Sequence, residues 1–140
     1  MKHCSPTDAC PCGKSTVSSK GKSTAVVYAE CCGRFIEGGT GAPDAASLMR
    51  SRYSAFVLER EAYLLSSWHA SYRPASIAFE PGVKWLGLDV RMHTPTDADH
   101  AVVEFVARSK SPGAAAVRLH ERSRFVREAG QWLYLDGDQL

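Results

Sequence analysis

The chain has 140 residues and a mass of 15.3 kDa, enough for one domain with a short appendage and too little for two full-sized domains. With 44% hydrophobic and 23% charged residues, its composition is that of an ordinary globular protein and excludes disordered and membrane-spanning classes. Basic residues gather at 14–22 and 118–127, but a formal net charge of +2 gives no pervasive basic surface, so nucleic acid is not an expected partner.

The expected location is the cytoplasm. No apolar run approaches the roughly 18 residues that span a bilayer, and the first dozen residues lack the apolar stretch of a secretory signal. We therefore expect no membrane partner. In a reducing compartment, clustered cysteines favour a metal site over a disulfide framework.

The cysteines and the aromatic residues occupy different parts of the chain. All five cysteines lie at or before position 32, whereas all three tryptophans follow position 50. A loop rich in Gly and Pro, residues 37–44, separates the two parts. We therefore divide the chain into a metal-binding head, residues 1–36, and a packed body, residues 37–140.

The body is expected to begin with helices. Asp44 is a suitable N-cap, and apolar residues recur at roughly helical spacing over 45–65. This pattern predicts one or two helices, with a break near Glu59. The segment 68–81 contains two prolines and has no clear period, so a loop or a short helical turn is predicted there.

After Pro81 the apolar residues alternate with a period of two, which is typical of β-strands. Strands are predicted over 84–92, 100–109, 115–128 and 131–136. Helices followed by antiparallel strands define an α+β fold, in which the helices cover one face of a curved sheet. The third strand is long enough to bend.

Four cysteines in the head form two closely spaced pairs, Cys10 with Cys12 and Cys31 with Cys32. The pairs can converge on one ion, and zinc favours four tetrahedral thiolate or imidazole ligands. Such a site supplies folding energy that so short a segment cannot obtain from burial. A closed four-cysteine site has no open position for water, which predicts structural zinc. The alternative is a terminus with free thiols.

Two further features of the head bear on this site. The second cysteine pair is expected beside a helical turn through residues 25–30. His3 or Cys4 could replace one of the four ligands, although both lie away from a partner pair in the sequence.

The cysteine segments resemble a known motif. Cys10-Pro11-Cys12-Gly13 and Cys31-Cys32-Gly33 are similar to the SEC-C motif, a zinc-binding element named for its place at the C-terminus of the SecA translocation ATPase. The spacer between the two pairs is about twice as long as usual in this motif, and Gly13-Lys14-Ser15-Thr16 replaces its Gly-Ser-Gly-Lys. This difference concerns the geometry of the ligands and not their identity.

The body resembles the bacterial YchJ-like proteins, a family of unassigned function. The segments that carry this resemblance are 48–56, 85–88, 103–108, 120–128 and 130–134. The resemblance covers nearly the whole chain from Cys10 to Asp136. It implies a nuclear-transport-factor-2-like (NTF2-like, or SnoaL-like) body, a cone of helices against a strongly curved sheet. Domains of this kind frequently form homodimers through the outer sheet face.

The hollow of such a cone is a candidate binding or catalytic cavity. Alternation along the third strand places Val117, Leu119, Glu121, Ser123 and Phe125 on one face, which we expect to point inward. Glu121 and Ser123 are then polar residues among apolar neighbours. Glu121 is a candidate general base.

Other residues extend this candidate pocket. Glu104 is a second acid/base candidate, although which side of its strand faces inward is left open. The alternative reading is that Glu104 and Glu121 pair with arginines across neighbouring strands. His69 could transfer a proton near the cone mouth or be a surface residue. Tyr134 is expected in the aromatic core, with its hydroxyl able to line the pocket.

The first helix contributes the last candidates. Tyr53 is included in the pocket, and Arg50 and Arg52 precede it. Arginines at i and i+2 of a helix point in different directions, so at most one of them can bind an anion at the cavity rim.

These features support two hypotheses. The first is a zinc-containing adaptor whose knuckle docks a protein partner. The second is a small-molecule-binding protein or an acid/base enzyme of hydrolase, isomerase or dehydratase type that uses the cavity. The sequence holds no nucleophile motif or cofactor fingerprint, so catalytic residues stay unassigned.

Overall fold

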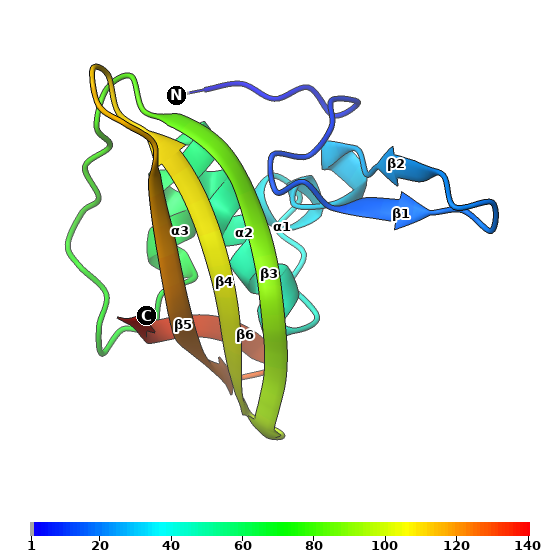
Figure 1. Cartoon of the computed structure of the whole chain (residues 1–140). Helices are drawn as coiled ribbons and strands as arrows, with labels where there is room; N and C mark the ends of the chain where they lie inside the picture. Colours follow the sequence, from blue (N-terminus) through cyan, green and yellow to red (C-terminus); the bar gives the residue numbers. More distant parts are fainter. Residues whose placement is uncertain (1) are drawn as a thin grey trace.

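The computed structural model describes residues 2–140 and is built around one curved antiparallel sheet (Figure 1). Its strands are β3 (Lys84–Asp97), β4 (His100–Lys110), β5 (Val117–Glu128) and β6 (Gln131–Gln139), and they lie in chain order. Each strand pairs with the next, as expected for strands joined by short turns. The predicted α+β class and the four predicted strands are confirmed.

Two of the strands are longer than predicted. β3 continues beyond residue 92 until Asp97 pairs with His100, and β6 continues beyond residue 136 until Gln139 pairs with Glu121. The added residues are mainly polar and exposed. Backbone hydrogen bonds to a neighbouring strand hold them in the sheet. Because such bonds do not depend on the side chains, these residues show no alternation of apolar and polar side chains that would predict a strand.

Helices α2 (Ala45–Leu58) and α3 (Glu61–Ser66) pack on one side of the sheet (Figure 1). The N-cap prediction is confirmed, because the backbone N–H of Ser47 donates to Asp44 Oδ1 at 2.7 Å. The predicted break is at Glu59, which adopts a left-handed conformation with φ 57°. None of the helices over residues 2–140 is long and apolar enough to cross a bilayer.

Replacing Glu59 with glycine is expected to raise the free energy of unfolding by about 0.5–1 kcal/mol, because glycine occupies the left-handed region without the steric cost that a β-carbon adds. Glu59 would lose only an exposed ion pair with Lys2 at 3.8 Å. Urea denaturation measures the change. Ala62→Gly, in the exposed interior of α3, is the matched control and should be destabilising. A Glu59→Gly protein no more stable than the parent would contradict the prediction.

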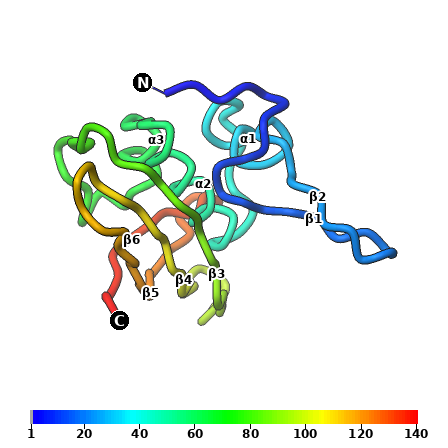
Figure 2. Tube along the Cα trace, turned by 45° about the horizontal axis from the view of Figure 1, so that its top comes forward, coloured from blue at the N-terminus to red at the C-terminus, as the bar shows by residue number. Residues whose placement is uncertain are grey.

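The head contains a β-hairpin that the sequence analysis missed. Strands β1 (Ser15–Val17) and β2 (Ser23–Ala25) pair with each other and project away from the body (Figures 1 and 2). The 3₁₀ helix η1 (Tyr28–Glu30) and the short helix α1 (Gly33–Ile36) follow. The helical turn predicted over 25–30 is therefore wrong in its first part. Three-residue strands that are exposed on both faces have no apolar pattern by which to recognise them.

One hydrophobic core runs through the head and the body. It includes the four paired cysteines and residues of α2, β4 and β5. Val103, Phe105 and Ala107 of β4 point to the helix side and are buried, which decides the question of which face of this strand is inward. The proposed division at residue 36 stays a prediction, since the packing is continuous across it.

The outer face of the sheet is covered with ion pairs. Arg124 Nε donates to Asp136 Oδ1 at 2.6 Å, and its Nη1 donates to Asp138 Oδ2 at 2.7 Å. Permanent dimer interfaces are usually more apolar than such a surface. A homodimer through this face stays a prediction.

Candidate functional site

The four paired cysteines meet in one buried cluster. The sulfurs of Cys10, Cys12, Cys31 and Cys32 all lie within 4.8 Å of one another, and each residue is at most 5% exposed. Cys12 Sγ and Cys31 Sγ are 3.6 Å apart. Cys4 lies outside this cluster and contacts the carbonyl oxygen of its neighbour.

The long spacer between Cys12 and Cys31 does not disturb the cluster, because most of its residues form the hairpin β1–β2. The backbone N–H of Gly13 donates to Cys10 O at 3.1 Å in a tight turn, and Gly13 has the positive φ (76°) that favours glycine. Cys10 N–H donates to Val26 O at 2.9 Å, and Val26 N–H donates to Lys14 O at 2.9 Å. These bonds close the base of the hairpin. Cys12 and Cys31, 19 positions apart in sequence, are thereby brought together.

The donor set suits a tetrahedral thiolate-binding ion. Four thiolates at about 2.3 Å from zinc would lie about 3.8 Å from one another, close to the observed spacing. Hydrogen bonds from the thiols of Cys12, Cys31 and Cys32 lower the pKa of Cys10, whereas the hydrogen bond to Cys10 raises the pKa of Cys32. Against the opposing effect of Cys10, hydrogen bonds from Cys31 and Cys32 also lower the pKa of Cys12, to about 7, while the pKa of Cys31 is raised. The cluster by itself therefore does not favour four thiolates, and a divalent cation would be needed to stabilise them.

Helix α2 supports the cluster from the body side. Arg50 Nη1 donates to the backbone oxygen of Cys12 at 3.2 Å and lies 3.9 Å from its sulfur. The Ser54 hydroxyl lies 3.6 Å from Cys10 Sγ. Arg50 and Ser54 are one helical turn apart, so they lie on one face of α2. Such outer contacts orient metal ligands and offset the negative charge of a thiolate site.

Removing the Arg50 side chain is expected to weaken metal binding by about 10- to 100-fold, the usual effect of losing an outer-shell contact. Competition with a chromophoric chelator measures the affinity of Arg50→Ala for Zn²⁺. Arg50→Lys, which keeps the positive charge, should retain part of the affinity. Arg91→Ala, on the exposed strand β3, is the control and should bind as the parent does. Equal affinities for all variants would show that Arg50 does not support the cluster.

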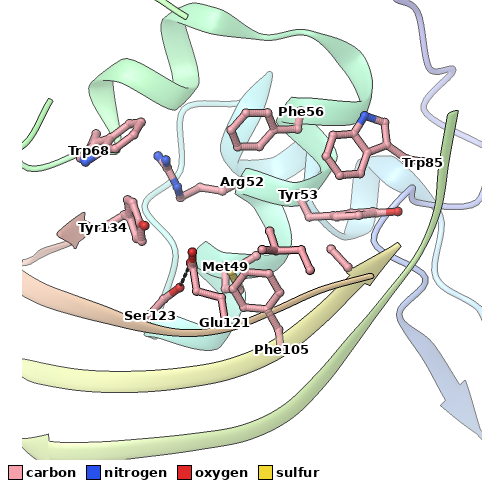
Figure 3. A pocket seen from close by; sticks show the side chains of 12 residues that line it. Met49, Arg52, Tyr53, Phe56, Trp68, Trp85, Phe105, Glu121, Ser123 and Tyr134 are labelled. Atoms are coloured by element: carbon pink, nitrogen blue, oxygen red, sulfur yellow. Dashed lines mark hydrogen bonds between the residues drawn. The ribbon is translucent and has the colours of Figure 1, made fainter. Parts of the chain in front are cut away.

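The second site is a cavity of about 270 Å³ between α2 and the inner face of the sheet (Figure 3). Ligand pockets commonly start at about this size. Met49, Arg52, Tyr53 and Phe56 of α2 line it, at the i, i+3, i+4 and i+7 spacing of one helix face. Leu119, 37% exposed, lies where the cavity reaches solvent along β5.

Four of the six predicted pocket residues line this cavity. They are Tyr53, Glu121, Ser123 and Tyr134 (Figure 3). The Ser123 hydroxyl donates to Glu121 Oε2 at 2.5 Å. None of the ion pairs in the described part of the chain includes Glu121, so the alternative reading of a cross-strand pair with an arginine does not hold for it.

The other two predicted residues lie elsewhere. Glu104 is on the outer face, where it accepts hydrogen bonds from His120 at 2.9 Å and from Arg122 at 3.2 Å. These partners, His120 first, hold the pKa of Glu104 below its usual value. The cross-strand reading of Glu104 is thus the right one, because the pleat turns it away from the helices.

His69 lies in the loop after α3, beside β6. Its backbone N–H donates to Tyr134 O at 2.7 Å, and its Nε2 lies 2.8 Å from Glu128 Oε2. Trp68 is the neighbour that reaches the cavity wall, with its indole N–H donating to Leu135 O at 3.0 Å. The acid/base hypothesis now rests on Glu121 alone.

Of the two arginines considered for the cavity rim, Arg52 is the one that lines the cavity, and it is buried. It is 4% exposed, and its guanidinium lies over the rings of Trp68 and Tyr134, 5.0 and 4.6 Å from their centroids. The helical spacing of residues 49, 52, 53 and 56 was the signal that could have found it. Arg50 lies two positions earlier, on a different face of α2, and contacts Cys12.

A helix-lined cone against a curved sheet, with a four-cysteine head, defines an NTF2-like protein with a SEC-C-like knuckle. The family model described as YchJ, middle NTF2-like domain, matches residues 44–137. The chain belongs to the YchJ-like family, as its resemblance implied.

Relatives and solved structures agree with this assignment. The chain is 64% identical to a UPF0225 protein of Polaromonas sp. over 95% of this chain and 94% of that one. It is 49% identical to a UPF0225 protein of Xanthomonas campestris over 97% of this chain and 98% of that one. The solution structure of a SEC-C motif-containing protein from Rhodopseudomonas palustris is similar, with a TM-score of 0.74 and 26% identity over 84% of this chain and 94% of that one.

A crystal structure of a SEC-C motif-containing protein from Psychrobacter arcticus is similar to the same degree. Its TM-score is 0.75 at 31% identity, and the match covers 94% of this chain and 82% of that one. The likeness extends over head and body together.

Proposed function

We propose that the protein is a cytoplasmic zinc-binding interaction module, in which one structural zinc fixes the base of the hairpin β1–β2 and the hairpin docks a partner. The observation that carries this proposal is the place of the cysteines. One pair lies directly before the hairpin and the other directly after η1, so an ion bound by both pairs would hold the two ends of the hairpin segment together. A reduced tetrathiolate site also suits a reducing compartment.

The surface of the hairpin supports docking to an acidic partner. Lys14, Lys20 and Lys22 are exposed, and no acidic residue occurs from 13 to 25. Val17 is 68% exposed and offers an apolar contact among these charges. Charge of one sign on a protruding element speeds association with an oppositely charged surface. The proposed partner is therefore a protein with an acidic docking site.

The zinc part is tested by metal content. Elemental analysis of the purified protein should find about one zinc per chain, as a closed four-thiolate site requires. Cys31→Ser should lose this zinc, whereas Cys4→Ser should keep it, because Cys4 lies outside the cluster. Zinc absent from the parent protein, or retained in Cys31→Ser, would reject the proposed ligand set.

The docking part is tested by charge removal on two surfaces. In the hairpin variant, Lys14, Lys20 and Lys22 are all changed to serine. In the control, three exposed basic residues of the body, Lys84, Lys110 and Arg118, are changed to serine, and both variants are tested in the zinc-loaded form. A protein captured by the parent and by the control, but lost from the hairpin variant, supports the proposal. Equal capture by both variants would overturn it.

A further inference from the structure

We propose that the cone cavity binds a small aromatic carboxylate, with the carboxylate against Arg52 and the ring against the aromatic wall. This binding site is separate from the zinc cluster and the hairpin, and it does not depend on the interaction role proposed for them.

Arg52 is a buried cation whose partners are neutral. Its Nη1 donates to Leu64 O at 2.8 Å and to Ser67 Oγ at 2.7 Å. None of the ion pairs found over residues 2–140 includes Arg52. Burial lowers its pKa to about 10, so the guanidinium stays charged at neutral pH. Among the residues that line the cavity, Glu121 is the one acidic side chain, and it attracts the guanidinium without forming an ion pair with it. An anion in direct contact with the guanidinium would therefore add a stabilising interaction that the protein alone does not supply.

The geometry at Arg52 leaves room for a flat anion. Within residues 2–140, the hydrogen bonds of Arg52 all come from Nη1, and its Nη2 and Nε are left for a ligand in the cavity. Figure 3 shows the guanidinium between Trp68 and Tyr134, at the edge of the cavity. A guanidinium edge matches a carboxylate in size and in the direction of its two hydrogen bonds.

The opposite part of the cavity is an aromatic wall. Tyr53 and Trp85 are in edge contact with centroids 5.6 Å apart, and Phe56 lies 6.1 Å from Trp85 (Figure 3). Phe105 and Met49 add apolar surface. Aromatic side chains favour offset or edge contacts with a planar ring. The volume of about 270 Å³ limits the ligand to roughly one ring with its substituents.

Glu121 narrows the class of ligand further. One of its carboxylate oxygens accepts from Ser123, and the other is free to accept from a hydroxyl or amine of the ligand. The Glu121 carboxylate repels any anion in the cavity, and this repulsion is larger for a dianion such as a phosphate ester than for a monocarboxylate held at Arg52. The chemistry that fits is a monocarboxylate with a hydrogen-bond donor on its ring.

The test compares two ligands of the same shape, one with a charged carboxylate and one with a neutral amide in its place. Zinc-loaded full-length protein is titrated with 4-hydroxybenzoate and with its neutral isostere, 4-hydroxybenzamide, by calorimetry. Fluorescence gives a second readout, because Trp68 and Trp85 both line the cavity. We expect the carboxylate to bind with a Kd below about 1 mM and at least tenfold more tightly than the amide.

Variants locate the binding site. Arg52→Gln should abolish the preference for the carboxylate, whereas Arg118→Gln, an exposed arginine on β5, should keep it. Since Arg52→Gln could unfold, the acid–amide comparison on the parent protein decides the proposal alone. Equal affinity for acid and amide, or no binding of 4-hydroxybenzoate, phenylacetate or benzoate at about 10 mM, overturns it. Neither result bears on the zinc content or the hairpin, which have their own tests.

Discussion

Changing Cys12 to serine is expected to lower the free energy of unfolding by at least about 4 kcal/mol and to abolish zinc binding. Structural zinc contributes about 10–16 kcal/mol in small zinc-binding peptides, so loss of one ligand removes a large share of the stability of the head. Cys12 is fully buried and belongs to the same core as α2 and β4. The effect should therefore reach the body. Thermal denaturation and urea titration measure it.

Hydrogen exchange distinguishes a local effect from a global one. In Cys12→Ser, amides of η1 and α1 should exchange fast, and those of α2 should lose part of their protection, because Arg50 and Ser54 lose their ordered partners. Treating the parent with a chelator should give the same pattern. A metal-free protein with an unchanged melting temperature would contradict a structural role for the ion.

Replacing Phe125 with alanine is expected to lower the free energy of unfolding by about 3–5 kcal/mol, the usual range for a buried phenylalanine. Phe125 is 1% exposed on the inner face of β5, and its ring makes an edge contact with Tyr134 at 5.6 Å. Removing the ring leaves a cavity, and because β5 is paired with both β4 and β6 the backbone cannot shift to fill it. Urea denaturation measures the loss.

The matched control for Phe125 is Tyr72, an aromatic residue of the loop after α3 that is 56% exposed. Tyr72→Ala should change the free energy of unfolding by less than about 0.5 kcal/mol. A cost below about 1 kcal/mol for Phe125→Ala would mean that the cone interior can collapse around the gap. The core would then be packed less tightly than the burial of its residues indicates.

The main elements of the body could be predicted because each has a local cause in the sequence. Asp44 supplies a side-chain cap, Glu59 lies at the break between two apolar stretches, and the strands alternate with a period of two. The four-cysteine cluster could be predicted from ligand chemistry, since two closely spaced pairs of thiols are typical ligands of a tetrahedral metal ion.

The remaining features depend on contacts between distant segments. The position of Glu104 follows from which face of β4 the helices cover, and alternation alone does not decide between two faces. His69 is fixed by the pairing of its loop with Tyr134, 65 positions later in the chain. Which of Arg50 and Arg52 reaches the cavity was left open, because the i and i+2 spacing shows only that the two side chains point in different directions. The spacing of residues 49, 52, 53 and 56 places Arg52 on the cavity side only once the face of α2 that covers the sheet is known.

The closed base of the hairpin has a consequence for protein engineering. Backbone bonds between residues 10 and 26 and between 14 and 26 hold the two ends of the segment, and the tip lies beyond them in solvent. Loop length adds little to the entropy of closure, so the tip at Ser18–Lys22 can accept an inserted peptide while the four thiols keep their places. A fluorophore or an affinity tag introduced there would report on the molecule from a point remote from both the cysteines and the cone.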